Sequence, residues 1–345
     1  MGNGGAGGNA AAGIAITDGS LTATSISLTA KAGSAGYVGS VRKEGKDNHG
    51  GDGGTAGTAS IKGLVLSGQQ AAVKVANNIV ITGTGGKGGN GGSTYGEAGL
   101  AAVGGAAEAY GLVAAGNGTY AVQFADLTLQ ATGGNGGSGG NTSIFYNQTT
   151  NNSQGDPYMS TDGADGGNAA SVGLTIQNGS MQLTAEAISS TAAGGTGGNA
   201  GWDNNANILE DSITHANAGQ GGEATATGIA VQSLLSNELA VGVITATATG
   251  GDGGSGANGS YADRMGAEVG GIGGIGGNAF AYSVWSSGTM AVAAGSIKAE
   301  AVGGTGGTGG TGGRDYVGSD VADGASGGIG GNAFAYSVWS SGTAA

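Results

Sequence analysis

Few residues of this chain have types and spacings that could do chemistry. His49 and His215 are the only histidines, and neither has a recognisable carboxylate partner nearby in the sequence. A catalytic histidine needs a partner within hydrogen-bond reach. The 345 residues include no cysteine, which excludes thiolate metal sites and disulfide bonds. Both histidines are therefore predicted to be surface residues.

Carboxylates from neighbouring repeats could form a hydrolytic cluster, because several acidic residues recur along the chain. Such a cluster needs acids at equivalent positions of successive repeats. Asp126, Glu186, Glu238 and Glu300 instead fall at different positions of their repeats. We therefore predict no catalytic residue and no enzyme activity.

Glycine-rich sequence imitates phosphate and calcium loops. In the segment 83–88, Gly88 follows Lys87 where a Ser or Thr should bind magnesium, and no helix-forming segment comes next. Asp52 and Asp252 lie in GGDGG, but no tandem calcium-binding nonapeptides surround them. The prediction is no cofactor and no metal, with calcium bridging between exposed carboxylates left open as an alternative.

The composition narrows the class of protein. The chain has 84 Gly, one Pro and 38% hydrophobic residues, so it lacks the proline of collagen and is too apolar for a disordered chain. Its net charge is -13 and its ten Lys and Arg are scattered, which argues against nucleic acid as a partner. No apolar run is long enough to span a membrane, and no signal peptide is visible after Met1.

Internal repeats organise the whole chain. The string GGIGGNAFAYSVWSSGT occurs at 273–289 and again, letter for letter, at 327–343, and weaker copies precede it. The second copy stops at Ala345, so we expect the chain to belong to a longer array. The predicted single array, 1–345, has units near 1–57, 58–105, 106–165, 166–220, 221–272 and 273–326 and a partial unit at 327–345.

Each unit contains three short segments in which apolar and small or polar residues alternate. In the first unit these are 13–16, 20–24 and 26–30. Alternation with a period of two is typical of strands with one buried face. The predicted fold is all-β: a repeat β-solenoid with about 48–62 residues per coil and three short strands in each.

Gly-Gly-X triplets follow the third segment of every unit but the first, as at 133–140, 194–198 and 303–313. A period of three fits polyproline II geometry. We therefore expect laminated polyglycine II helices beside the solenoid; flexible linkers are the alternative. Variable loops are expected on one side, at 42–49, 141–162, 202–215, 258–268 and 314–323.

The two identical copies predict ladders of stacked aromatic residues. Parity places Phe280 and Tyr282 on one strand face and Trp285 on the other. The predicted pairs are Phe280 with Phe334, Tyr282 with Tyr336 and Trp285 with Trp339.

Self-assembly is predicted because neither end of the sequence resembles the polar or helical cap of a monomeric repeat protein. Two chains joined end to end would continue the repeat as a homopolymer. We expect Val338 to lie at the assembling end, where a proline should blunt the edge strand.

The segments GNAAAGIAITDGSLTATSISLTA at 8–30 and NAFAYSVWSSGTMAVAAGSIKAEAV at 278–302 resemble the coils of autotransporter and filamentous-haemagglutinin-type passenger domains. The triplets are similar to the glycine-rich repeats of mycobacterial surface proteins and to the polyglycine arms of phage tail-tip adhesins. The resemblance implies secretion, a bacterial cell-surface location, and adhesion or scaffolding.

These features predict a structural subunit or repeat segment of an extracellular filament, sheath or matrix. The alternative is the stalk of a cell-surface adhesin, with cell-surface or matrix polysaccharide as a partner. A more remote alternative is an ice-binding protein, because Thr22 and Thr24 form a local threonine row.

Overall fold

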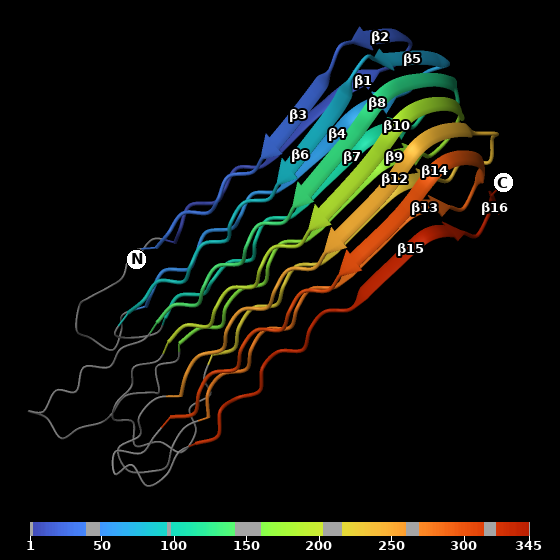
Figure 1. Cartoon of the computed structure of the whole chain (residues 1–345). Coiled ribbons are helices and arrows are strands. Elements are labelled where there is room, and N and C mark those ends of the chain that lie inside the picture. Colours follow the sequence, from blue (N-terminus) through green and yellow to red (C-terminus); the bar gives the residue numbers. More distant parts are fainter. Residues whose placement is uncertain are drawn as a thin grey trace, which may run out of the picture.

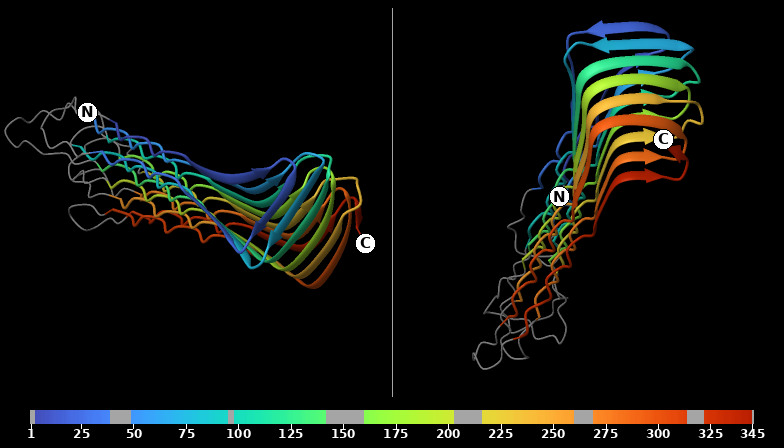
Figure 2. Two further views of the ribbon diagram at one scale, coloured as in Figure 1. Left: turned by 90° about the horizontal axis from the view of Figure 1, so that it is seen from above. Right: turned by 45° about the vertical axis from the view of Figure 1, so that its right-hand side comes forward.

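The structure, a computed structural model, describes residues 3–38, 49–94, 98–141, 160–202, 216–259, 269–313 and 322–344. The described residues form strands and extended glycine-rich segments, and they contain no helix (Figure 1). The strands gather at one end, where two sheets face each other. The glycine-rich segments run side by side away from the sheets as a long arm (Figure 2).

The smaller sheet has seven parallel strands in chain order. It contains one strand from each repeat, entered from the glycine-rich arm. The strands are β1 (Ala10–Ile16), β4 (Ala59–Leu66), β7 (Ala107–Ala114), β9 (Ala169–Ile176), β11 (Ala224–Val231), β13 (Ala279–Ser286) and β15 (Ala333–Ser340). In the first half of strands such as β4 and β7, buried small or apolar residues alternate with more exposed residues, as a half-buried strand requires.

The larger sheet has nine parallel strands, and its strands lead back to the arm. In the first two repeats each long strand is divided into two shorter ones. The strands are β2 (Gly19–Ala23), β3 (Ile26–Lys31), β5 (Gln70–Val75), β6 (Asn78–Thr84), β8 (Thr119–Thr132), β10 (Ser180–Ala193), β12 (Glu238–Thr249), β14 (Thr289–Val302) and β16 (Thr343–Ala344).

The expected β-solenoid with three short strands per coil is wrong. The structure has two large parallel sheets, and from the third repeat onward the second and third alternating segments form one continuous strand of 12 or 14 residues. The strand continues through Asp126 in β8 without the interruption that Ala76 and Asn77 make between β5 and β6. The periodicity of two does not distinguish a continuous strand from two strands joined by a short bend.

The core lies between the inner faces of the two sheets. Residues at equivalent positions of successive repeats stack above one another, such as Leu64, Leu112 and Leu174 in the smaller sheet. All three side chains are almost fully buried. Complete burial of such a side chain stabilises the fold by roughly 1.5–3 kcal/mol, so each added repeat extends the same core.

The two sheets are staggered. β12 packs against both β11 and β13, and β14 packs against both β13 and β15. Each long strand therefore lies between two strands of the facing sheet, about half a strand spacing from each.

The glycine-rich segments are assigned neither helix nor strand, yet they are hydrogen-bonded to one another throughout the described part of the arm. Segments leaving the sheets alternate with segments returning to them: Gly105 N donates to Gly86 O at 2.8 Å, and Gly134 N donates to Gly105 O at 2.8 Å. A Cβ on Gly134 would lie 1.8 Å from Gly86 O. Only glycine permits this approach. Most residues of the five expected variable loops lie outside the described residues.

Candidate assembly interface

Edge strand β15 has a partner on one side only within the described chain. It pairs with β13 in parallel, with residues 54 positions apart opposite each other, as in Ala279 and Ala333. Residues throughout β15 are exposed, whereas their counterparts in β13 are buried or half-buried. The exposure comes from position, because the two strands have the same sequence. An unpaired strand edge with apolar side chains is a template for another strand.

Val338 lies on this edge strand and is 53% exposed, whereas its counterpart Val284 is 1% exposed. Ser341 N donates to Ser286 O on the β13 side at 2.9 Å. Amide directions alternate along a strand, so Trp339 N also points to β13 and Val338 N points to the open edge. Val338 therefore offers both a free ladder donor and an uncovered apolar side chain.

The six aromatic residues of the identical copies form three stacked pairs. Ring centroids are 5.3 Å apart for Phe280 and Phe334, 5.4 Å for Tyr282 and Tyr336, and 5.6 Å for Trp285 and Trp339. Interplanar angles are 8° or less.

The three pairs share the outer face of the smaller sheet. Strict alternation would place Trp285 on the face opposite to Tyr282. However, the consecutive residues Ser283 and Val284 are both buried, so the alternation is interrupted between them. This irregularity restores Trp285 to the same face as Tyr282. One ring of each pair lies on β15, so it covers its partner and leaves its own far side open.

Asparagine and aspartate side chains bind each repeat to the next, a role that the sequence reasoning missed. In the triplet 194–196, Gly194 N donates to Thr249 O at the end of β12 at 2.9 Å, and Gly195 N donates to Gly167 O of another glycine-rich segment at 2.8 Å. The third amide, Thr196 N, donates to Asn135 Oδ1 of the preceding repeat at 3.2 Å. Other acceptor and donor pairs are Asn9 with Thr58, Asp52 with Leu100, Asp165 with Gln220, Asn168 with Glu223, Asn199 with Ser255, Asp252 with Thr305, Asn258 with Thr311 and Asn278 with Asn332.

All these hydrogen bonds have the same direction along the chain. The side chain belongs to the earlier repeat and the backbone amide to the later one. The two aspartates considered for calcium, Asp52 and Asp252, belong to this set. The usable sequence signal was the recurrence of Asn and Asp at the X position of triplets, because their short side chains readily bond to backbone amides.

Asn237 makes the same kind of connection inside the sheets, where it is fully buried. Its Oδ1 accepts from Met181 N of β10 at 3.0 Å, and its Nδ2 donates to Thr289 O of β14 at 3.1 Å. Nδ2 also donates to Leu235 O at 2.7 Å. One side chain therefore joins three successive repeats.

The residues considered for chemistry do not converge. Asp126 lies opposite Ala187, Glu238 opposite Gln182 and Glu300 opposite Thr247 in the larger sheet. His49 precedes a glycine-rich segment, and His215 lies outside the described residues. Among the residues that the structure describes, no group of three or more His, Asp and Glu could hold a metal ion.

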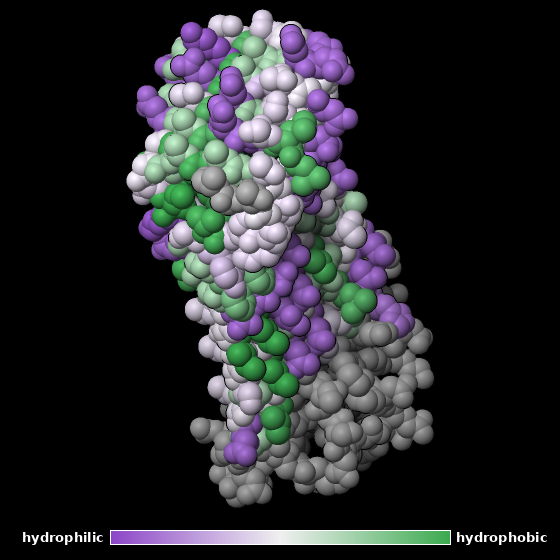
Figure 3. Space-filling model, turned by 90° about the vertical axis from the view of Figure 1, so that its right-hand side faces the viewer, coloured by the Kyte–Doolittle hydropathy of each residue, from purple (hydrophilic) through white to green (hydrophobic). Residues whose placement is uncertain are grey.

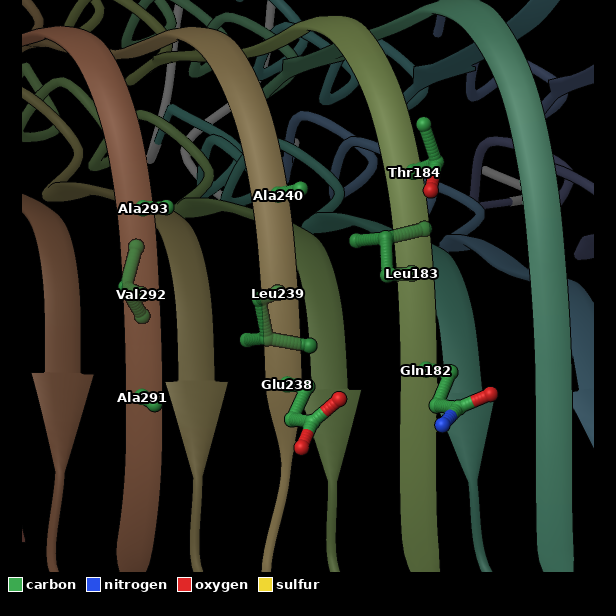
Figure 4. A pocket seen from close by; sticks show the side chains of 9 residues that line it. All are labelled: Gln182, Leu183, Thr184, Glu238, Leu239, Ala240, Ala291, Val292 and Ala293. Carbon is green, nitrogen blue, oxygen red and sulfur yellow. The ribbon is translucent and has the colours of Figure 1, made fainter.

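A surface depression crosses β10, β12 and β14 and has a volume of about 580 Å³ (Figure 4). Glu238 is the one ionisable residue of its lining, beside Gln182 and Thr184. The other lining residues are apolar. Its lining contains neither a nucleophile paired with a base nor a set of metal ligands.

Hydrophobic side chains elsewhere on the surface form small groups. The connection between β11 and β12 exposes Leu234 and Leu235. On the face shown in Figure 3, hydrophobic and hydrophilic residues are interspersed over the sheets and the arm.

Comparison with known proteins gave no match to a family model, to a curated protein or to a solved structure. None of the described segments forms a helix long and apolar enough to cross a membrane.

Proposed function

We propose that this chain is a non-enzymatic structural protein, a subunit or repeat segment of an extracellular filament, sheath or matrix. Its chains join end to end through open strand edges. The observation that carries the proposal is the parallel pairing of β13 with β15, in which identical sequences stack residue on residue. A strand of this sequence can therefore pair with a further copy of itself.

The continuous stacking of equivalent residues supports a structural role. Parallel pairing connects seven strands of the smaller sheet in chain order, and asparagine side chains connect successive repeats in the arm. A further strand would add the same contacts. The net charge of -13 favours solubility of the unassembled chain.

The location outside the cell rests on the resemblance of residues 8–30 and 278–302 to secreted passenger domains. The purified chain should form unbranched filaments visible by electron microscopy, and its sedimentation should depend on concentration. A monomer at every concentration would refute the filament proposal and favour the adhesin stalk. Binding of such a monomer to cell-surface polysaccharide would then be the next measurement.

A further inference from the structure

Charge is distributed unevenly along the chain. Although the ten Lys and Arg form no dense cluster, seven of them lie in residues 1–87, which contain only four of the 23 Asp and Glu. Residues 1–87 therefore carry a net positive charge, and the rest of the chain carries a net negative charge. Because the repeats stack in chain order, the first two repeats form a basic part of the stack and the later repeats form an acidic part.

The outer face of the larger sheet shows the same asymmetry. In the strands of the first two repeats the only charged residues are two lysines, Lys31 on β3 and Lys74 on β5. Each strand of the next three repeats carries one acid and no base: Asp126 on β8, Glu186 on β10 and Glu238 on β12. All five side chains are exposed, so they lie on the face turned away from the core.

These charges are not neutralised within one copy. In the part of the chain that the structure describes, the two lysines and three acids of this face form no salt bridge, whereas Lys298 and Glu300 of β14 pair with each other at 2.9 Å. Neighbouring strands lie about 4.8 Å apart, so Lys74 in the second repeat and Glu238 in the fifth are separated by roughly 14 Å. This distance exceeds the screening length of about 8 Å at physiological ionic strength. The basic and acidic parts therefore act as separate surfaces.

A second copy of the chain has the charges that this face requires. We propose that copies associate side by side through the outer faces of their larger sheets, shifted along the stacking axis by three repeats. The shift brings Lys31 and Lys74 of one copy to the levels of Glu186 and Glu238 of the other. It leaves the strand edges at both ends of each stack free. The contact therefore rests on the proposed filament and adds to it the association of neighbouring filaments.

Glu238 occupies a recessed position that suits a lysine side chain. It lines the depression of about 580 Å³ together with Gln182, Thr184 and Ala240 (Figure 4). A lysine can lay its methylene groups on apolar surface while its ammonium group reaches a polar partner. The ammonium group has three donors, which the carboxylate, amide and hydroxyl oxygens of this depression can accept. The depression thus offers both parts of the contact that an incoming lysine needs.

Ionic strength distinguishes this contact from end-to-end assembly. Single exposed salt bridges are weak, so a few of them hold two chains only loosely, whereas filaments repeat them many times along their length. The screening length falls from about 8 Å at 0.15 M salt to about 3 Å at 1 M. Side-by-side association should therefore be lost at high salt. The backbone hydrogen bonds between stacked strands carry no net charge, so filament length should change little.

Charge reversal on this face tests the contact. An acidic variant combines Lys31→Glu with Lys74→Glu, and a basic variant combines Glu186→Lys with Glu238→Lys. At about 0.1 M salt, each variant alone should reduce the fraction of filaments lying side by side in electron micrographs on the order of tenfold. A mixture of the two variants should restore it, because each supplies the charge that the other lacks. Failure of the mixture to restore association would overturn the proposed contact.

The matched control combines Lys62→Glu with Lys87→Glu. It changes the net charge as much as the acidic variant does, but its residues lie on the smaller sheet and in the arm. It should associate as the parent chain does, and an equal loss would overturn the assignment to the larger sheet. Parent filaments that remain single at about 0.1 M salt would overturn side-by-side association and leave the filament function standing. If the parent sediments as a monomer at every concentration and at low salt, both proposals are wrong.

Discussion

Single polar side chains determine how firmly successive repeats are joined. In the arm, exposed asparagines and aspartates accept one backbone amide each from the next repeat. In the sheets, buried Asn237 has three hydrogen bonds to two neighbouring strands and its own loop. Water can replace the exposed hydrogen bonds of the arm, but it cannot replace the buried hydrogen bonds of Asn237.

We expect Asn237→Ala to lower the free energy of unfolding by about 3 kcal/mol, because it leaves buried donors and acceptors unpaired. The control is Asn258→Ala, which removes an exposed bond to Thr311 N and should cost about 0.5 kcal/mol. Urea denaturation followed by circular dichroism measures both. Equal losses would show that burial does not set the strength of these connections.

Tyr110, on β7, should make the free energy of unfolding depend on pH in the alkaline range. Partial burial raises its pKa above the ordinary value, and the negative charge of Glu108 raises it further. The folded state thus holds the phenolic proton more tightly than the unfolded state. This contribution to stability is fully present below about pH 10 and is lost as pH rises through the folded pKa.

Tyr110→Phe should therefore flatten the decline of the melting temperature above about pH 10 while changing it little at neutral pH. Thermal melts of both proteins across that range provide the measurement. A parallel decline in the two proteins would assign the alkaline instability to other groups.

At the scale of elements, the glycine-rich arm depends on backbones that approach without side chains between them. Gly195 N donates to Gly167 O at 2.8 Å, and a Cβ on Gly195 would lie 2.0 Å from Gly134 O. The neighbouring Thr196 has an exposed side chain. Two adjacent residues of one triplet thus differ completely in the space available to them.

Gly195→Ala should separate neighbouring segments and destabilise the arm by on the order of 3 kcal/mol, as expected for severe steric overlap. Thr196→Ala is the control and should change stability by less than about 0.5 kcal/mol. Hydrogen exchange of the arm amides would locate the effect. Unchanged protection in Gly195→Ala would contradict the close packing of these segments.

At the scale of the whole molecule, the proposed end-to-end assembly predicts the effect of a proline in edge strand β15. Pairing of seven strands in one sheet leaves β15 with an unpaired side. Proline removes a backbone donor and is tolerated mainly at sheet edges. Val338 N points to the open edge, so its loss affects a joining chain more than the contact with β13.

Val338→Pro should leave the circular dichroism spectrum nearly unchanged and reduce assembly by on the order of tenfold, measured as the fraction that sediments at a fixed concentration. Val338→Thr keeps the amide and a β-branched side chain, and should assemble nearly as the parent chain does. Filaments of normal length from Val338→Pro would exclude β15 from the contact between chains.

The sequence by itself determined the local features of this protein. Alternating segments such as 59–66 became strands, because one face could be buried. Glycine triplets marked where backbones come close, and the absence of helical periodicity agreed with the all-β structure. These features follow from neighbouring residues, so they can be read without knowing what packs against them.

Only the tertiary structure decided how the segments combine. The continuity of β8 through Asp126, the stagger of β14 between β13 and β15, and the bond from Thr196 N to Asn135 all depend on contacts between residues far apart in the sequence. The return of Trp285 to the outer face likewise depends on an irregularity at Ser283 and Val284. The sequence pattern allows several local conformations equally. Pairing with neighbouring strands and burial in the core decide which of them forms.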